Sequence, residues 1–161
     1  MDDGLLTVDC GQKNNMPQYK ITEPTSGTDL QKYYDFRFEV LRKPWDQPKA
    51  STQDEWENIS VHILMTNEKG EAIASGRLQL NNEDEGQIRS MAVRADMQGK
   101  GLGSQIIKYI EQKAKEKKLK QLILDSRINA VKFYEKHGYE VVGDSYLLFG
   151  IIKHFKMTKN L

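Results

Sequence analysis

The feature of this sequence that most restricts its fold is a cluster of three glycines, Gly99, Gly101 and Gly103. The cluster follows a strand-like run, residues 87–93, and precedes residues 102–117, where apolar side chains recur every four positions as on one face of a helix. At such a junction the first N–H groups of the helix have no partner, and glycine lets an anion approach them closely. The sequence therefore predicts a phosphate-binding turn, with an empty flexible turn as the alternative.

Two common phosphate-binding motifs do not fit this cluster. A P-loop needs the spacing GxxxxGK[ST], which the chain lacks. The dinucleotide fingerprint GxGxxG needs its third glycine one position after Gly103, and it normally opens a parallel sheet rather than following a run of hairpins. A nucleotide-binding site of either kind is therefore the weaker interpretation.

The composition limits the class of protein. The chain has 161 residues and a formal net charge of +1, and it has no basic run interleaved with aromatic residues, which argues against a nucleic-acid partner. No apolar run approaches the ~20 residues that span a bilayer, and the N-terminus is acidic where a secretory signal is basic. Cys10 is the only cysteine, which excludes an intrachain disulfide and a cysteine-ligated metal site. We expect a cytoplasmic protein that binds no membrane and no metal.

Hydrophobic periodicity predicts one domain over residues 17–161, preceded by a flexible extension at residues 1–16. A helix is expected from Asp29, with Thr28 or Asp29 as its cap and Pro44 as its end. After it, residues 45–58 are expected to form a loop or a short second helix. Strands are expected at residues 18–23, 60–65, 71–80 and 87–93, the last three as antiparallel neighbours.

The C-terminal part continues this alternation of elements. Residues 121–125 are continuously apolar, which predicts a strand buried on both faces. A short helix is expected over residues 129–136, with His137 and Gly138 as its stop. Two further strands are expected at residues 139–143 and 151–157. Hairpins that lead into a strand–helix–strand crossover predict an α+β domain.

Three stretches of the chain point to one family. Residues 98–103 read QGKGLG, which fits the pattern [QR]xxGx[GA]; residues 128–143 read INAVKFYEKHGYEVVG; and residues 37–44 read RFEVLRKP. Together they resemble the acetyl-CoA signature, a later motif and the first helix of the GNAT N-acetyltransferase superfamily. The resemblance covers the chain from residue 18 to its end. It implies a mixed, mostly antiparallel sheet of six to seven strands flanked by helices, with a central strand–helix–strand acetyl-CoA site.

The resemblance assigns roles to particular residues. Backbone N–H groups of the glycine loop are expected to bind the pyrophosphate of acetyl-CoA, with Gln98 or Lys100 adding a polar contact. The strand before the loop is expected to pair with the pantetheine arm, which requires a bulge or splay to free its main-chain groups. Asn129 is expected to contact the CoA arm, with a helix N-terminal cap or a residue of the first helical turn as the alternative. The full set of cofactor contacts is Met91, Ala92, Val93, Gln98, Gly99, Lys100, Gly101, Leu102, Gly103, Ser104 and Asn129.

The catalytic acid is expected to be Tyr134, which the resemblance places where it can protonate the departing thiolate; a ring that simply packs on the sheet is the alternative. The base is open. The candidates that take the proton from the acceptor amine are His62, Glu55, Arg89 and His154, with a water relay as the alternative. Candidate walls of the acceptor pocket are Trp45, Trp56 and Tyr33, which are otherwise ordinary core residues.

The chain departs from related sequences in two places. Many relatives carry an acidic residue before a GIPH stretch, where this chain has Leu148 and Phe149, and this predicts a more apolar rim. Gln98 stands where arginine is commoner. The resemblance implies an N-acetyltransferase that moves the acetyl group of acetyl-CoA to a primary amine of a small molecule or a protein by direct attack on the thioester. The alternative is an inactive acyl-CoA-binding sensor or scaffold with the same fold. A homodimer is common among relatives.

Overall fold

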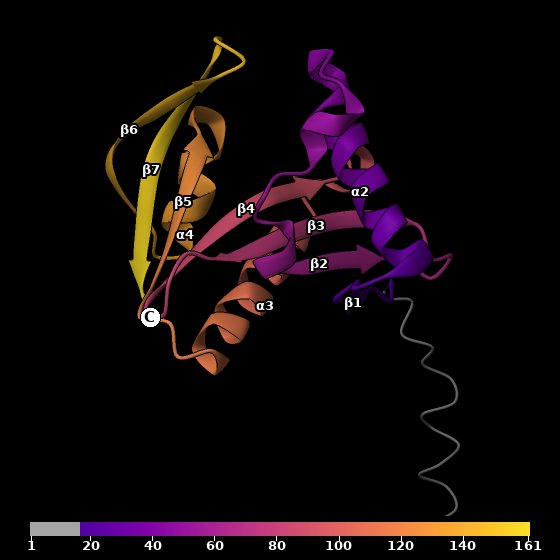
Figure 1. The fold of residues 1–161 in the computed structure, drawn as a ribbon, viewed down its shortest axis with the longest axis horizontal. Helices are drawn as coiled ribbons and strands as arrows, with labels where there is room; N and C mark the ends of the chain where they lie inside the picture. The colour runs from indigo at the N-terminus through magenta and orange to yellow at the C-terminus, as the bar shows by residue number, and fades with distance from the viewer. Residues whose placement is uncertain (1–16) are drawn as a thin grey trace, which may run out of the picture.

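The computed structural model describes residues 17–161, and the expected extension at residues 1–16 lies outside this range together with Cys10. The chain begins with one short strand, a long helix and three antiparallel strands (Figure 1). These elements are β1 (Lys20–Thr22), α2 (Gly27–Leu41), the 3₁₀ turns η1 (Lys43–Trp45), η2 (Lys49–Thr52) and η3 (Glu57–Ile59), and the strands β2 (Ser60–Thr66), β3 (Ala72–Leu80) and β4 (Glu85–Val93). The second part contains η4 (Ala95–Met97), α3 (Leu102–Glu116), β5 (Gln121–Arg127), η5 (Ile128–Ala130), α4 (Val131–Lys136), β6 (Glu140–Leu148) and β7 (Ile152–Asn160).

The seven strands form one sheet in the order β1-β2-β3-β4-β5-β7-β6. Within it β4 and β5 are parallel neighbours, because α3 carries the chain back between them, and the other pairs are antiparallel. In Figure 1, β5 and the β6–β7 hairpin lean away from β1–β4, so that the sheet opens in its middle. The expected mixed α+β fold with a central strand–helix–strand unit is confirmed.

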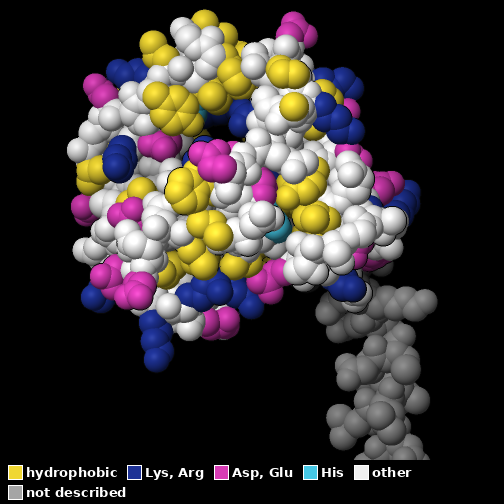
Figure 2. Space-filling view, viewed as in Figure 1, with side chains coloured by type: hydrophobic (Ala, Val, Ile, Leu, Met, Phe, Trp, Pro, Cys, Tyr) yellow, Lys and Arg dark blue, Asp and Glu magenta, His cyan; other side chains and the backbone are white. Residues whose placement is uncertain are grey.

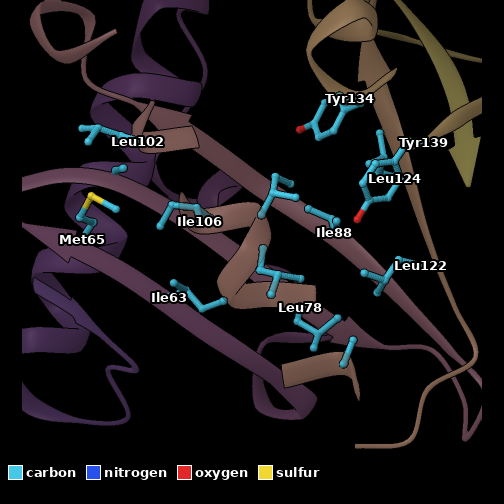
Figure 3. Close-up of a cluster of buried hydrophobic side chains, with 14 of the residues drawn as sticks. Ile63, Met65, Leu78, Ile88, Leu102, Ile106, Leu122, Leu124, Tyr134 and Tyr139 are labelled. Atoms are coloured by element: carbon cyan, nitrogen blue, oxygen red, sulfur yellow. The ribbon is translucent and has the colours of Figure 1, made fainter. Parts of the chain in front are cut away.

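Helix α3 covers an apolar face of the sheet (Figure 3). Ile63 and Leu78 on this face are fully buried, as are Ile106 and Ile110 on the helix. A Cβ atom at Gly76 would lie 2.7 Å from the side chain of Ile106, so glycine on β3 is what allows the helix to come this close. This layer is the main hydrophobic core.

Helix α2 covers the opposite face, and this face is polar. His62 and Arg77 are paired across β2 and β3, and because successive residues of a strand alternate in direction, they point away from α3. Both are buried, and so is Arg37 on α2. The two faces of one sheet therefore have different chemistry.

Four expectations about the elements are wrong in detail. The cap of α2 is Ser26, not Thr28 or Asp29, and it makes no side-chain capping bond. The helix ends at Leu41, where the cap residue has already left helical dihedrals, so Pro44 lies in η1 instead of ending α2. Strand β5 is not buried on both faces: buried and half-buried residues alternate along it. Strands β6 and β7 are longer than the apolar runs, since backbone pairing continues through polar residues.

Among the described helices, none is long and apolar enough to cross a membrane.

Candidate active site

A gap in strand pairing creates the site. The parallel pairing of β4 with β5 consists of four residue pairs, and the last of them joins Ile88 to Leu124. Beyond it, the pairing of β4 with β3 shifts register, and Ser90 has a left-handed backbone with φ +55°. A non-glycine residue in this region is strained, and the hydroxyl of Ser75 donates a 3.0 Å hydrogen bond to the Ser90 carbonyl that holds it there. Among the strands that the structure describes, the bulge and the splay together leave the β5-facing edge of residues 89–93 without a partner.

The glycine loop joins this free edge to α3. Gly99 and Gly101 have φ of +77° and +79°, and a Cβ atom at either position would meet nothing within 4 Å. The two glycines therefore serve the turn and keep the backbone open, whereas Gly103 serves packing, since a Cβ there would lie 3.1 Å from Phe133. In the described chain, Gln105 is the first residue of the helix whose N–H bonds back, to the Gly101 carbonyl at 3.2 Å. The earlier N–H groups are available to an anion at the positive end of α3.

Side chains of the loop take less part than its backbone. The Gln98 amide donates to the Val93 carbonyl at 3.3 Å, and the exposed Lys100 ammonium lies 3.9 Å from a methionine sulfur. The Ser104 hydroxyl lies 2.9 Å from Nε2 of His137, within hydrogen-bond distance. Asn129 is exposed in η5. It is not a cap residue there, because the N-cap of η5 is Arg127 and that of α4 is Ala130. The predicted cofactor contacts thus lie along one path, from the β4 edge through the loop to η5.

A cavity of about 310 Å³ lies at the opening between β4 and β5. Leu124 and Tyr134 line it from the apolar face of the sheet, and Arg89, Arg127 and His154 line it from the α2 face. Figure 2 shows a hollow on this side of the molecule, with dark-blue Lys or Arg side chains inside it and apolar side chains along its upper edge. A ligand that enters from one face can therefore meet a ligand that enters from the other.

Tyr134 lines the cavity between β4 and β5, where its ring is packed and its hydroxyl makes no hydrogen bond to another described residue. The ring makes edge contacts with Phe133 and Tyr139 at 5.0 and 5.9 Å between centroids. The hydroxyl has no hydrogen-bond partner among the described residues and is not one of the fully buried unpaired atoms, and the residue lines the cavity, so we infer that the hydroxyl faces it. Burial raises the pKa of Tyr134, and the charge of Arg127 offsets this only in part. The phenol is thus a protonated donor at neutral pH.

Of the four candidate bases, the structure brings two to the cavity, Arg89 and His154. His62 is buried under α2, where one ring nitrogen bonds the Glu57 carbonyl at 3.0 Å and the other lies 3.2 Å from a tyrosine hydroxyl. Glu55 is exposed in a turn away from the cavity lining. The aromatic residues Trp45, Trp56 and Tyr33 do not line the cavity either.

His154 has a defined tautomer. Its Nδ1 lies 2.9 Å from the Ile152 carbonyl, and since a carbonyl only accepts, Nδ1 carries the hydrogen and donates it. In this tautomer Nε2 is the nitrogen that can accept a proton. It has no partner among the described residues and is not a fully buried atom, so it opens to the cavity. The ring of Tyr146 stacks on the imidazole at 4.8 Å and fixes its plane.

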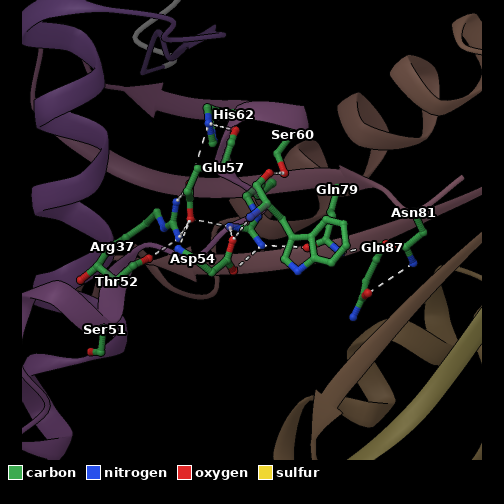
Figure 4. Close-up of polar contacts among 12 residues, drawn as sticks. Arg37, Ser51, Thr52, Asp54, Glu57, Ser60, His62, Gln79, Asn81 and Gln87 are labelled. Carbon is green, nitrogen blue, oxygen red and sulfur yellow. Dashed lines mark hydrogen bonds and ion pairs between the residues drawn. The ribbon is translucent and has the colours of Figure 1, made fainter.

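Beneath the cavity, a buried ionic network fastens α2 to the sheet (Figure 4). Glu57 bonds Arg37 through two oxygens at 2.8 and 3.0 Å and also pairs with Arg77. Arg77 in turn holds Asp54 at 2.9 and 3.1 Å. Burial would raise the pKa of Glu57, but the hydrogen bond and charge of Arg37, with the charge of Arg77, outweigh burial and hold the pKa below its usual range. No sequence pattern predicted this network, because its members are up to 40 positions apart.

The sequence analysis also missed two arginines of the cavity, Arg42 and Arg127. Arg42 lies over the ring of Phe149 at 5.5 Å, and Arg127 over that of Trp45 at 5.8 Å. Leu148 lines the cavity, so the expected apolar residue at the rim is present. Basic residues at a helix end and a strand end are common, so no pattern distinguished these two arginines before the fold placed them together.

Comparisons with known proteins agree with this geometry. Residues 30–161 match the sequence profile described as Acetyltransferase (GNAT) domain. The uncharacterised N-acetyltransferase YjcF of Bacillus subtilis is 31% identical over 124 residues, which cover 77% of this chain and 87% of YjcF. An acyl-CoA N-acyltransferase from Pseudomonas aeruginosa has a similar fold, with a TM-score of 0.73 at 19% identity over 89% of this chain and 99% of that one. A GNAT family acetyltransferase from Elizabethkingia anophelis, solved with acetyl-CoA bound, has a TM-score of 0.70 at 20% identity, covering 92% and 100% of the two chains.

Proposed function

This chain belongs to the GNAT acetyltransferase family, and on that premise we propose that it transfers the acetyl group of acetyl-CoA to a primary amine by direct attack on the thioester. Membership of the family makes the protein an acyltransferase with acetyl-CoA as its co-substrate. The observation that carries the proposal is a cavity lined by residues from both faces of the sheet, which fits a thioester and an amine that approach one point from separate sides.

The two open glycines support binding of the diphosphate by backbone. A Cβ atom at Gly99 or Gly101 would have no neighbouring atom within 4 Å, so the space beside these glycines is not filled by the protein. The N–H groups of the first helical turn, which lack partners among the described residues, border this space. The residues present therefore fit a diphosphate. The free edge of β4 suits an extended amide chain, as in strand addition. Bound there, acetyl-CoA supplies an electrophilic carbonyl carbon: the amine nitrogen forms the new C–N bond, the C–S bond breaks, and the thiolate leaves.

Tyr134 is the proton donor in this scheme. Its hydroxyl faces the cavity from the apolar face, the side from which the thioester arm arrives. Burial keeps the phenol protonated until a negative sulfur develops beside it. A positioned general acid of this kind contributes about 10²-fold or more to the rate.

His154 is the base. The amine arrives as an ammonium, which has no lone pair, so a proton must be removed before attack. Nε2 of His154 opens to the cavity from the α2 face, and the hydrogen bond from Nδ1 to the Ile152 carbonyl keeps the lone pair on Nε2. In this scheme the proton donor Tyr134 and the proton acceptor His154 lie on opposite faces of the opening. This arrangement fits a thiolate that leaves on one side and an amine that arrives on the other.

The test is release of free thiol from acetyl-CoA with a panel of amines: polyamines, aminoglycosides, amino acids and peptides. Acetylation of at least one amine, with no acetylated protein in a mass spectrum taken before the acceptor is added, supports direct transfer. An acyl-CoA-binding sensor behaves differently: acetyl-CoA raises its melting temperature, yet no amine releases thiol. An acetylated side chain that passes its acetyl group to the acceptor would contradict direct attack.

A further inference from the structure

The charges that line the cavity are unbalanced. Arg37, Arg42, Arg89 and Arg127 face it, against Asp54 and Asp125. Two of these six are already neutralised: Arg37 by the buried Glu57, and Asp54 by Arg77. Three cations and one anion remain.

The three remaining arginines have no carboxylate of their own. In the described part of the chain, none of Arg42, Arg89 and Arg127 forms an ion pair. They act on one another instead: burial and then the positive charges of Arg37, Arg127 and Arg89 lower the pKa of Arg42, with only a phenol opposing them. Arg89 also lies directly across the strand pair from Arg77, a placement of like charges that costs stability.

Aromatic rings hold two of these guanidinium groups by their faces. Phe149 lies under Arg42, and Trp45 lies under Arg127. The Nε–H group of Arg42 donates a hydrogen bond to the Ser51 carbonyl at 3.2 Å. A stacked guanidinium keeps the N–H groups at its edge free for a planar anion. Clustered cations that stay together without a partner are stabilised when an anion binds.

The remaining anion of the cavity is placed differently. Asp125 accepts hydrogen bonds from the Ser145 hydroxyl at 2.6 Å and the Gln87 amide at 3.3 Å, and no cation of residues 17–161 forms an ion pair with it. It follows Leu124, the last residue of β5 that pairs with β4, so it stands at the opening itself. A carboxylate there attracts an ammonium to the point where the two faces meet.

We propose that the acceptor is a small amine that also carries an oxyanion, a carboxylate or a phosphate, which Arg42, Arg89 and Arg127 bind while Asp125 draws the amine toward the opening. This inference rests on the proposed acetyl transfer and names the substrate class. Polyamines and aminoglycosides, which carry only positive charge, are then poor acceptors. A cavity of about 310 Å³ also favours a small molecule over a folded protein.

The experiment compares pairs of amines that differ only in the anion: β-alanine with β-alaninamide, glycine with glycinamide, and phosphoethanolamine with ethanolamine. Thiol release is measured at one pH, with rates corrected for the fraction of unprotonated amine. We expect kcat/KM to be at least about tenfold higher for the anionic member of a pair, because hydrogen bonds to charged groups are the stronger ones. Equal rates within pairs, or spermidine as the best acceptor, would overturn the proposal.

Variants locate the effect. Arg89→Gln, Arg42→Gln and Arg127→Gln are each expected to raise the KM of the anionic amine about tenfold or more and to leave the KM of acetyl-CoA unchanged. Lys20→Gln removes an exposed cation on β1, far from the cavity, and is the matched control. If the KM of acetyl-CoA rises instead, the arginines bind the cofactor and the proposal is wrong.

A binding measurement separates this proposal from the proposed function. With CoA present, β-alanine or phosphoethanolamine is expected to raise the melting temperature more than the uncharged partner does, and Arg89→Gln is expected to remove the difference. If no amine releases thiol but this shift is present, acetyl transfer fails and the anion site stands. If thiol is released but the shift and the rate preference are both absent, the anion site fails and acetyl transfer stands.

Discussion

The two faces of the sheet differ in the groups that they offer to a ligand and in the parts of the chain that supply these groups. On the α3 face, backbone and apolar side chains from one continuous stretch, β4 to α3, form the side that we propose for the cofactor. On the α2 face, charged side chains from α2, from the segment between η2 and η3, and from β4, β5 and β7 meet around the cavity. Backbone recognition suits a ligand that is the same in every family member. Side-chain recognition can change one residue at a time, so this face can adapt to a new acceptor without disturbing the other.

Gly101→Val should have the largest effect, on the cofactor side. Valine is strained at φ +79° and its side chain would occupy the open space beside the helix N-terminus. We expect acetyl-CoA binding, measured by calorimetry, to be abolished. Gly70→Val is the matched control, because Gly70 has φ +75° in a distant hairpin and only a lysine ammonium at 3.9 Å. Equal loss of stability with retained binding in both variants would show that the loop is a structural turn only.

Glu57→Gln should have the next largest effect, on the α2 face. It leaves Arg37 without its carboxylate and Arg77 with one fewer, and an uncompensated buried charge costs about 3–5 kcal/mol. Urea denaturation at neutral pH measures this loss. Glu39→Gln, which breaks an exposed pair with Lys43, should leave the unfolding free energy unchanged within error.

The pH dependence of that loss provides a second check. Because the pKa of Glu57 is lower in the folded protein than its unfolded value of about 4.3, the folded state binds fewer protons there. Its stabilisation is complete above the unfolded pKa and is lost as pH falls through the folded pKa. The gap between wild type and Glu57→Gln should therefore shrink in acid. A gap that is constant with pH would mean that the variant acts through packing.

Tyr134→Phe tests the meeting point of the two faces. We expect kcat to fall about 10²-fold while the KM of acetyl-CoA changes little, since the ring still packs and only the proton is lost. Tyr139→Phe is the matched control: its hydroxyl bonds Glu111 at 3.0 Å away from the cavity, so it should cost stability but not kcat. An unchanged kcat in Tyr134→Phe would remove this residue from the mechanism.

His154→Gln should have the smallest effect, about tenfold in kcat/KM at neutral pH, because solvent can also take the proton. The loss should shrink as pH rises, since more of the acceptor amine is then already deprotonated. His62→Gln, which changes a buried histidine outside the cavity, should not show that recovery. A loss that is the same at every pH would assign His154 a structural role.

The same division explains how much could be predicted from sequence. The glycine loop, α3 and the β4 strand are contiguous, so periodicity and one short motif were enough to predict their order, whereas the expected role of Tyr134 comes only from the family resemblance. The network of Arg37, Glu57 and Arg77, and the arginines around the cavity, depend on contacts between distant segments. His62 alternates with apolar neighbours as a site residue would, yet α2 covers it. One sequence contains no signal for such coverage.

The opening between β4 and β5 has a further consequence. Unsatisfied strand edges at the border of a sheet invite other polypeptides and can seed aggregation. Here the unsatisfied edge lies in the interior, flanked by α3 on one side and the β6–β7 hairpin on the other (Figure 1). The edge of another sheet cannot align with it there as it could at a border, whereas a single extended chain of amide bonds fits beside one strand. The unpaired N–H and C=O groups of this edge are thus accessible to a small extended ligand but not to the sheet edge of another protein molecule.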